Sequence, residues 1–219
     1  EQACEGLAGV SASQVEIQSG IQFYDGISTA EIQEILIKSA SDLIDLDNPN
    51  YQYVAARLLL FSVKKSLYGR MHETPLLKDH VVKCVEKGIY DREILNLYND
   101  EEFDKLQDII DHDRDYLFTY AGLRQVVDKY LVQDRSTGSL YETPQFMYLL
   151  ISATIFSKYP KEIRLDYVKK YYDAISKHKI NIPTPIMAGV RTPLRQYASC
   201  VLVDIDDTLD SIFSSDMAI

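Results

Sequence analysis

One cysteine near the C-terminal end of the chain lies where a thiol could do chemistry. Cys200 follows Ser199 and begins a short apolar run, and Arg191 and Arg195 lie a few residues upstream. Neighbouring positive charge lowers a thiol pKa and favours the thiolate, the reactive form. The same pattern also fits a cysteine that packs inside a buried strand. From these residues alone, Cys200 is either a reactive thiol or a core residue.

Polar segments lie on both sides of this cysteine. Residues 183–185 read PTP, which ordinarily forms a rigid turn. Asp204, Asp206 and Asp207 follow the apolar run. Carboxylates at such a place ordinarily stabilise the positive end of a helix dipole. A structural role and a binding role both remain open for these residues.

The densest cluster of titratable residues reads IDHDRD, residues 110–115. Metal ligands must converge on one point. Adjacent residues of a helix point in different directions, so Asp111, His112 and Asp113 are poorly placed as ligands. We therefore expect a helix end with local ion pairs and no metal site. The remaining histidines are isolated in the sequence, without a nucleophile at a recognisable spacing: His72, His80 and His178.

The overall charge narrows the classes of partner. The formal net charge is -10, which argues against duplex nucleic acid and against an anionic membrane surface. No apolar run approaches the roughly 18–20 residues of a membrane span.

The three cysteines are far apart, with no CxxC pair, so a reducing, cytoplasmic setting is expected. No glycine-rich nucleotide loop is present.

The elements that must position these residues are mainly helices. Capping boxes at Ser28/Glu31 and Asn99/Glu102 predict two helix starts. Gly69 and Gly88 are typical helix stops. The helical patterns cover residues 28–45, 51–69, 74–88 and 91–115.

The second half of the chain is more varied. Ser136-Thr137-Gly138 predicts a short hairpin, and Thr143-Pro144 predicts a helix start. Three prolines predict that residues 178–193 are not helical. The other expected elements are a helix over 161–177, a buried strand over 198–205 and the start of a helix over 206–213.

A single strand has no partner for its backbone groups, so we expect the chain to end inside a domain. We expect the first domain boundary between Tyr68 and Pro75. The organisation is then a helical domain over residues 1–70, followed by a helical region and the start of a further fold over 71–219.

Together these segments resemble the large (alpha) subunit of class I ribonucleotide reductase. The resemblance rests on DGISTAEI, PNYQYVAARLLLF, IDHDRD and KYLVQDRSTGSLYETPQF, and above all on PTPIMAGVRTPLRQYASCVLVDIDDTLDSI. It implies an ATP-cone-like helical domain over 1–70, without the opening hairpin of that family. It also implies a helical region over 71–219 that leads into the first strands of a ten-stranded α/β barrel, incomplete here.

The resemblance also implies residue roles in the catalytic part. Cys200 matches a redox-active cysteine that forms a disulfide with a distant partner as the 2′-hydroxyl of the substrate leaves as water. Thr184 and Ser199 match residues of the substrate pocket. Asp207 matches the acid that accepts a hydrogen bond from the sugar hydroxyl of the specificity effector at the dimer interface.

In the cone-like part, Thr29 and Lys65 match contacts of the activity-site nucleotide. Two histidines familiar in relatives are replaced by Gln33 and Ser62. No cofactor is expected in this chain itself. The implied effectors are ATP, dATP and other deoxynucleoside triphosphates, and a metal-containing small (beta) subunit supplies the radical.

The activity implied by the resemblance is the reduction of ribonucleoside diphosphates for DNA synthesis, by a homodimer of large subunits that thioredoxin or glutaredoxin re-reduces. The 219 residues alone are expected to be inactive. One alternative is a helical nucleotide-sensing or assembly module without catalysis of its own. Another is a helical scaffold without a site.

Overall fold

The computed structural model describes residues 1–71, 73–195 and 197–218, and helices dominate this part of the chain. None of the described helices combines the length and the apolar character that a membrane crossing requires. The elements in chain order are η1 (Gln2–Cys4), α1 (Ala12–Gly20), α2 (Thr29–Asp42), α3 (Tyr51–Tyr68), α4 (Leu77–Glu86), α5 (Glu93–Leu97), α6 (Asp100–Ile109), η2 (His112–Leu117), α7 (Tyr120–Gln125), η3 (Val126–Tyr130), α8 (Pro144–Phe156), α9 (Lys161–Ser176), α10 (Thr184–Gly189) and α11 (Leu209–Ala218).

The helix ends follow the local sequence signals. Both predicted capping boxes form, with the Ser28 and Asn99 side chains accepting from the backbone N–H groups of Glu31 and Glu102. Gly69 ends α3 in the left-handed region at φ 71°, where glycine has no Cβ to clash. The third helix starts at Leu77, three residues later than the pattern from Thr74 predicts.

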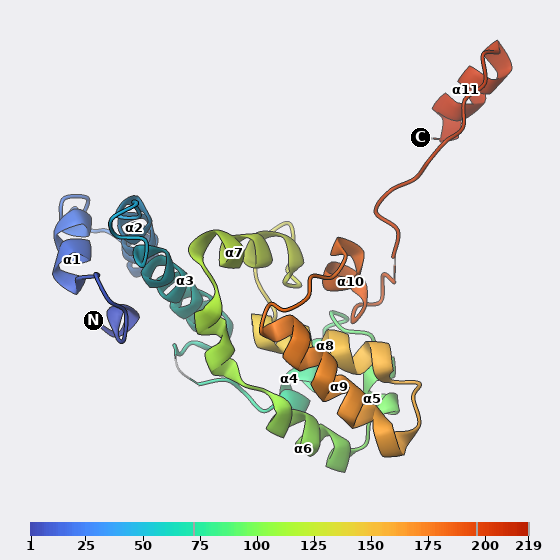
Figure 1. Cartoon of the computed structure of the whole chain (residues 1–219), viewed down its shortest axis with the longest axis horizontal. Helices are drawn as coiled ribbons and strands as arrows, with labels where there is room; N and C mark the ends of the chain where they lie inside the picture. Colours follow the sequence, from blue (N-terminus) through green and yellow to red (C-terminus); the bar gives the residue numbers. More distant parts are fainter. Residues whose placement is uncertain (72, 196, 219) are drawn as a thin grey trace.

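Helix α3 joins two apolar cores. Val54 and Phe61 pack with α1 and α2, which lie beside α3 at the N-terminal end of the molecule (Figure 1). Leu60 and Val63 belong to a larger core with the helices from α4 to α10. The two apolar cores are therefore tied together by one continuous helix.

Helix α8 is the centre of the larger core. Every residue from Pro144 to Ala153 is buried. Thr143 is its N-cap and Pro144 its first residue, as the sequence predicts. A helix that is apolar all round must be surrounded by protein. The predicted hairpin precedes it, and Gln133 and Leu140 form its antiparallel bridge.

The expectation that residues 178–193 contain no helix is wrong. Helix α10 forms over Thr184–Gly189, with Pro183 as N-cap and Pro185 in the first turn. Proline is tolerated there because the first N–H groups of a helix have no intrahelical partner. The expectation of no helix therefore holds for residues 178–183 and 190–193, on both sides of this turn.

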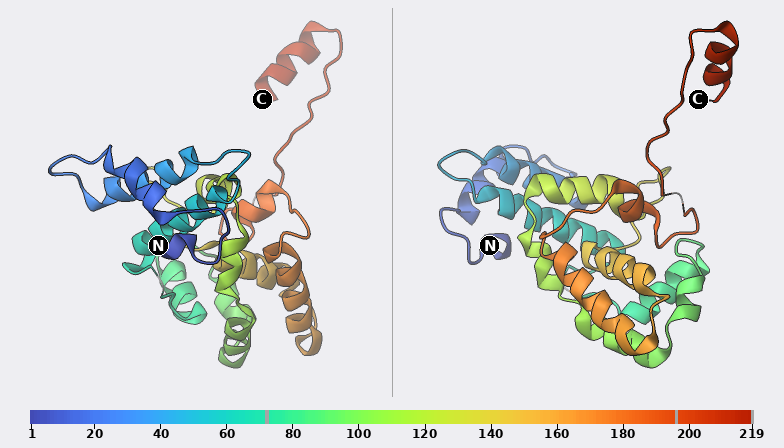
Figure 2. Two further views of the ribbon diagram at one scale, coloured as in Figure 1. Left: turned by 60° about the vertical axis from the view of Figure 1, so that its left-hand side comes forward. Right: turned by 45° about the vertical axis from the view of Figure 1, so that its right-hand side comes forward.

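The prediction of a buried strand over 198–205 is also wrong. The described residues between α10 and α11 contain no strand. Val201 and Leu202 are 82% and 99% exposed. A strand needs a neighbour for its backbone hydrogen bonds, and none lies beside this segment. The segment extends away from the helices and ends in α11, whose start near residue 206 was predicted (Figures 1 and 2).

Candidate functional site

A cavity of about 590 Å³ lies between the hairpin, α10 and the segment that follows α10. Thr184 and Ser199, the two residues matched to a substrate pocket, both line it. Lys129 and Arg135 add two positive charges, and none of the described lining residues is acidic. Hydroxyl groups, cations and the absence of carboxylates suit a phosphate-bearing ligand.

Two short helical turns shape this cavity. The η3 segment is a π-helix that ends at Tyr130, and π-turns frequently occur at functional sites. The Tyr130 hydroxyl lies 3.4 Å from the Thr184 hydroxyl at the start of α10. The π-turn therefore brings a phenol next to the threonine that the sequence singles out.

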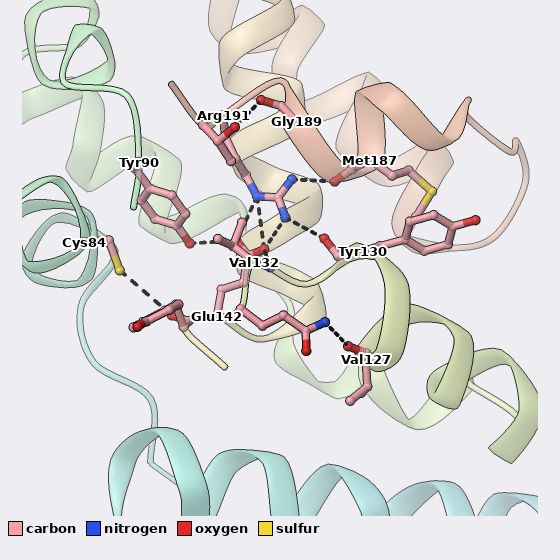
Figure 3. Close-up of polar contacts among 12 residues, drawn as sticks. Cys84, Tyr90, Val127, Tyr130, Val132, Glu142, Met187, Gly189 and Arg191 are labelled. Atoms are coloured by element: carbon pink, nitrogen blue, oxygen red, sulfur yellow. Dashed lines mark hydrogen bonds and ion pairs between the residues drawn. The ribbon is translucent and has the colours of Figure 1, made fainter. Parts of the chain in front are cut away.

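A buried ion pair holds α10 against the hairpin (Figure 3). The side chains of Arg191 and Glu142 are fully buried, with the arginine Nε 2.8 Å from a carboxylate oxygen. The guanidinium also donates to the carbonyl oxygens of Met187 (2.5 Å) and Tyr130 (3.0 Å). A buried charge needs such complete pairing. Arg191 thus fixes α10 and the π-turn, the two turns that shape the cavity.

A neutral polar chain completes the environment of Glu142. The Tyr90 hydroxyl donates to Glu142 at 2.6 Å, and His80 Nε2 lies 3.1 Å from the same hydroxyl. Burial lowers the pKa of His80 to about 4, so its imidazole is neutral at pH 7. Burial also raises the pKa of the nearby Cys84 thiol to about 12. Cys84 is thus a buried thiol that is not poised to react.

Cys200 is the exposed thiol of the three cysteines, all of which the structure describes. Its sulfur lies 3.7 Å from the hydroxyl of Ser199, which lines the cavity. The two upstream arginines do not supply the positive charge that was expected beside the Cys200 thiol. Arg191 is paired with Glu142, and Arg195 is paired with Asp91 and Glu93.

Asp207 lies apart from this cavity. It is exposed in the bend before α11. An extended segment separates α11 from the other helices (Figure 2). The structure therefore brings Thr184 and Ser199 to one cavity, with Cys200 next to Ser199 in the chain, and leaves Asp207 separate.

Thr29 and Lys65 occupy matching ends of an antiparallel helix pair. Thr29 is the first residue of α2, and Lys65 lies in the last turn of α3. The Gln33 side chain donates to the carbonyl oxygen of Leu58 at 3.2 Å, which places the start of α2 beside the second half of α3. Both residues are exposed.

The IDHDRD segment forms the 3-10 helix η2 with local ion pairs, as expected. Asp111 accepts from Arg114 Nε at 3.1 Å and caps the N–H of Asp113. His112 is hydrogen-bonded to Thr74 at 3.1 Å. Among the described residues, no cluster of three metal-ligating side chains occurs. His178 packs on Phe118, and His72 lies outside the described residues.

Asp115 at the end of this segment is fully buried, and burial raises the pKa of its carboxyl to about 7. The Gln145 amide donates to one of its oxygens at 2.8 Å, and the other has no protein partner. Because the unfolded pKa is about 3.9, the folded chain retains a proton that the unfolded chain releases between about pH 4 and pH 7. Stability from this group is therefore present below pH 4 and falls as the pH rises to 7.

We expect Asp115→Asn to remove this pH dependence, because the amide imitates the protonated carboxyl. The free energy of unfolding of the variant should exceed that of the wild type by an amount that grows to on the order of 2–4 kcal/mol between pH 4 and pH 7. Urea unfolding at several pH values measures it. Asp104→Asn, at an exposed position of α6, is the matched control because Asp104 does not contribute to the shifted pKa of Asp115. A difference that stays constant with pH would contradict the assignment.

Several residues of this region were missed in the sequence. Glu142 carries one signal: an acidic residue directly before the Thr-Pro start of a strongly apolar helix. Lys129 and Arg135 look like ordinary surface charges, and only the fold brings them to the same cavity as Thr184.

Comparisons with known proteins converge on one family. Residues 116–195 match the family described as the ribonucleotide reductase, all-alpha domain. The ribonucleoside-diphosphate reductase 1 subunit alpha of Escherichia coli (strain K12) is 56% identical over 217 residues, which cover 99% of this chain and 28% of that protein. The Haemophilus influenzae subunit alpha is 57% identical, with 99% and 29% covered. The phage T4 subunit alpha is 45% identical over 206 residues, with 93% and 27% covered. The chain spans less than a third of these relatives.

Proposed function

Since this chain belongs to the ribonucleotide reductase family and aligns along 99% of its length with large (alpha) subunits, we propose that it contributes to the reduction of ribonucleoside diphosphates to deoxyribonucleoside diphosphates. The observation that carries the proposal is the cavity shared by Thr184 and Ser199, with Cys200 directly adjacent. These are the three residues that the family resemblance assigns to substrate and redox chemistry.

In this proposal the substrate diphosphate binds to the hydroxyl groups of Thr184 and Ser199, with Lys129 and Arg135 supplying positive charge. Cys200 and a partner cysteine elsewhere in the complete subunit each give up one electron and one proton. They form a disulfide, and the 2′-hydroxyl leaves as water. Thioredoxin or glutaredoxin then reduces the disulfide. The radical that starts the reaction comes from the metal-containing small subunit.

We assign the remaining matched residues in the same way. Asp207 accepts a hydrogen bond from the sugar hydroxyl of the specificity effector at a homodimer interface, and the segment after α10 leads into the α/β barrel of the complete subunit. Thr29 and Lys65 contact the activity-site nucleotide, supported by their place at matching ends of α2 and α3. Residues 1–70 then act as the nucleotide-sensing domain of a cytoplasmic enzyme.

The test is deoxyribonucleotide formation by the complete subunit with its small-subunit partner. We expect Thr184→Val to raise the KM for the diphosphate about 10–100-fold, because a hydrogen bond to a charged group contributes about 1.5–3 kcal/mol. With kcat little changed, this identifies a binding role.

Thr154→Val is the matched control, because the Thr154 hydroxyl donates to the Leu150 carbonyl within α8. Equal KM values for both variants and the wild type would remove Thr184 from the substrate site. No deoxyribonucleotide product from the wild-type subunit would refute the proposed activity itself.

A further inference from the structure

A second cavity, of about 490 Å³, lies at the C-terminal end of α9. It shares α10 with the candidate substrate cavity but uses a different residue of it. Met187 lines this second cavity, whereas Thr184 and Pro185 line the first. The volume is within the range of small-molecule sites, about 300–1,000 Å³. The proposed function gives this cavity no role.

The cavity has flat apolar walls. Phe118 and Tyr148 both line it, and their rings are nearly parallel, with an interplanar angle of 12° and centroids 6.4 Å apart. Ile175 and Met187, from α9 and α10, add aliphatic surface. Aromatic walls favour a planar ring, through offset or edge-to-face contacts.

The charge of the lining is positive on a chain whose net charge is -10. Lys179 lines the cavity, and none of the described lining residues is acidic. Lys179 is exposed and makes no ion pair with a described residue. The side chain of Asn181 adds polar surface at the same rim. An unpaired ammonium group beside apolar walls suits a ligand with one ring system and one negative charge.

His178, at this cavity, has a backbone conformation that is unusual for a residue with a Cβ. It follows α9 at φ 55°, and the next residue, Lys179, donates to the Ala174 carbonyl at 2.9 Å. Helix ends of this kind ordinarily carry glycine, because a Cβ is strained in the left-handed region. The His178 ring lies 4.5 Å from the Phe118 ring and lines the cavity. Strained positions of this kind cluster at ligand sites.

Partial burial lowers the pKa of His178 below its usual value, which favours the neutral imidazole. His178 then serves as a third aromatic wall, and Lys179 supplies the charge.

We propose that this cavity binds a small planar aromatic anion, with its ring packed against the wall formed by Phe118, Tyr148 and His178 and its negative group paired with Lys179. The site is distinct from the candidate substrate cavity, and α10 lies between them.

The experiment compares two fluorescent probes of nearly the same shape on the complete subunit. The anionic probe is 1-anilinonaphthalene-8-sulfonate, and the uncharged one is N-phenyl-1-naphthylamine. We expect Lys179→Gln to weaken binding of the anionic probe at least tenfold and to change the affinity of the uncharged probe less than twofold. Lys158→Gln makes the same charge change at an exposed site outside the cavity and should alter neither affinity.

His178→Gly separates binding from folding. Glycine relieves the strain of the left-handed backbone conformation, so Tm should rise. Loss of the imidazole ring from the cavity wall should weaken binding of both probes. A photoreactive naphthalene sulfonate should label residues within 117–122 or 175–187. The proposal is overturned if Lys179→Gln and Lys158→Gln act alike, if His178→Gly leaves both affinities unchanged, or if labelling falls elsewhere.

Discussion

Replacing Arg191 by methionine is expected to lower the free energy of unfolding by about 3–5 kcal/mol, because it leaves the buried Glu142 carboxylate without its cation. Both side chains are fully buried, so water cannot replace the lost partner. The methionine also cannot donate to the carbonyl oxygens of Met187 and Tyr130. Urea unfolding followed by circular dichroism measures the change.

A second variant separates the buried charge from the lost packing. The double variant Glu142→Gln/Arg191→Met should recover part of the loss, because a neutral amide can still accept from Tyr90 or from the N–H of Val132. Arg195→Met is the matched control, since Arg195 pairs with Asp91 and Glu93 in solvent-exposed positions. Its loss should be far smaller. Similar losses for Arg191→Met and Arg195→Met would show that burial of the pair is not decisive.

Replacing Cys200 by serine is expected to abolish multiple turnover in the complete subunit. The proposed reaction needs two electrons from two thiols, and a serine hydroxyl cannot form a disulfide. Folding should be unaffected, because Cys200 is exposed and its sulfur makes a weak contact, at 3.7 Å, with the hydroxyl of the neighbouring Ser199. A deoxyribonucleotide assay measures the loss, and the melting temperature reports the fold.

Cys4→Ser is the control for this change. Cys4 is partly buried, and burial raises its thiol pKa, so it is not poised to react. We expect turnover close to wild type in that variant. Wild-type turnover in Cys200→Ser would remove the redox role, and the nucleotide-sensing and scaffold hypotheses would then explain the chain better.

The local parts of the fold could be predicted from the sequence, because their signals lie within one turn of the chain. The Ser28/Glu31 and Asn99/Glu102 boxes and the glycine stop at Gly69 are examples. The strand over 198–205 failed because a strand depends on a neighbour that local sequence does not supply. Helix α10 was missed because its prolines occupy the turn where proline is allowed.

The candidate site was predictable only through the family resemblance. Thr184 and Ser199 were singled out by their motif, and the cavity that they share is formed by segments from distant parts of the chain. Pairing of Glu142 with Arg191 spans 49 residues, and no periodicity relates the two. Such contacts depend on tertiary packing, which local propensity cannot encode.

The position of Arg191 late in the chain sets an order of events on the ribosome. Domains form from the N-terminus as the chain emerges. Glu142 emerges 49 residues before Arg191, so its carboxyl group lacks its ion-pair partner until the later segment has been made. When residue 191 emerges, its side chain neutralises Glu142 and its carbonyl accepts from the Asp91 N–H at 3.0 Å. Arg191 is thus the residue that completes the ion pair with Glu142, and the exposed segment is made directly after it.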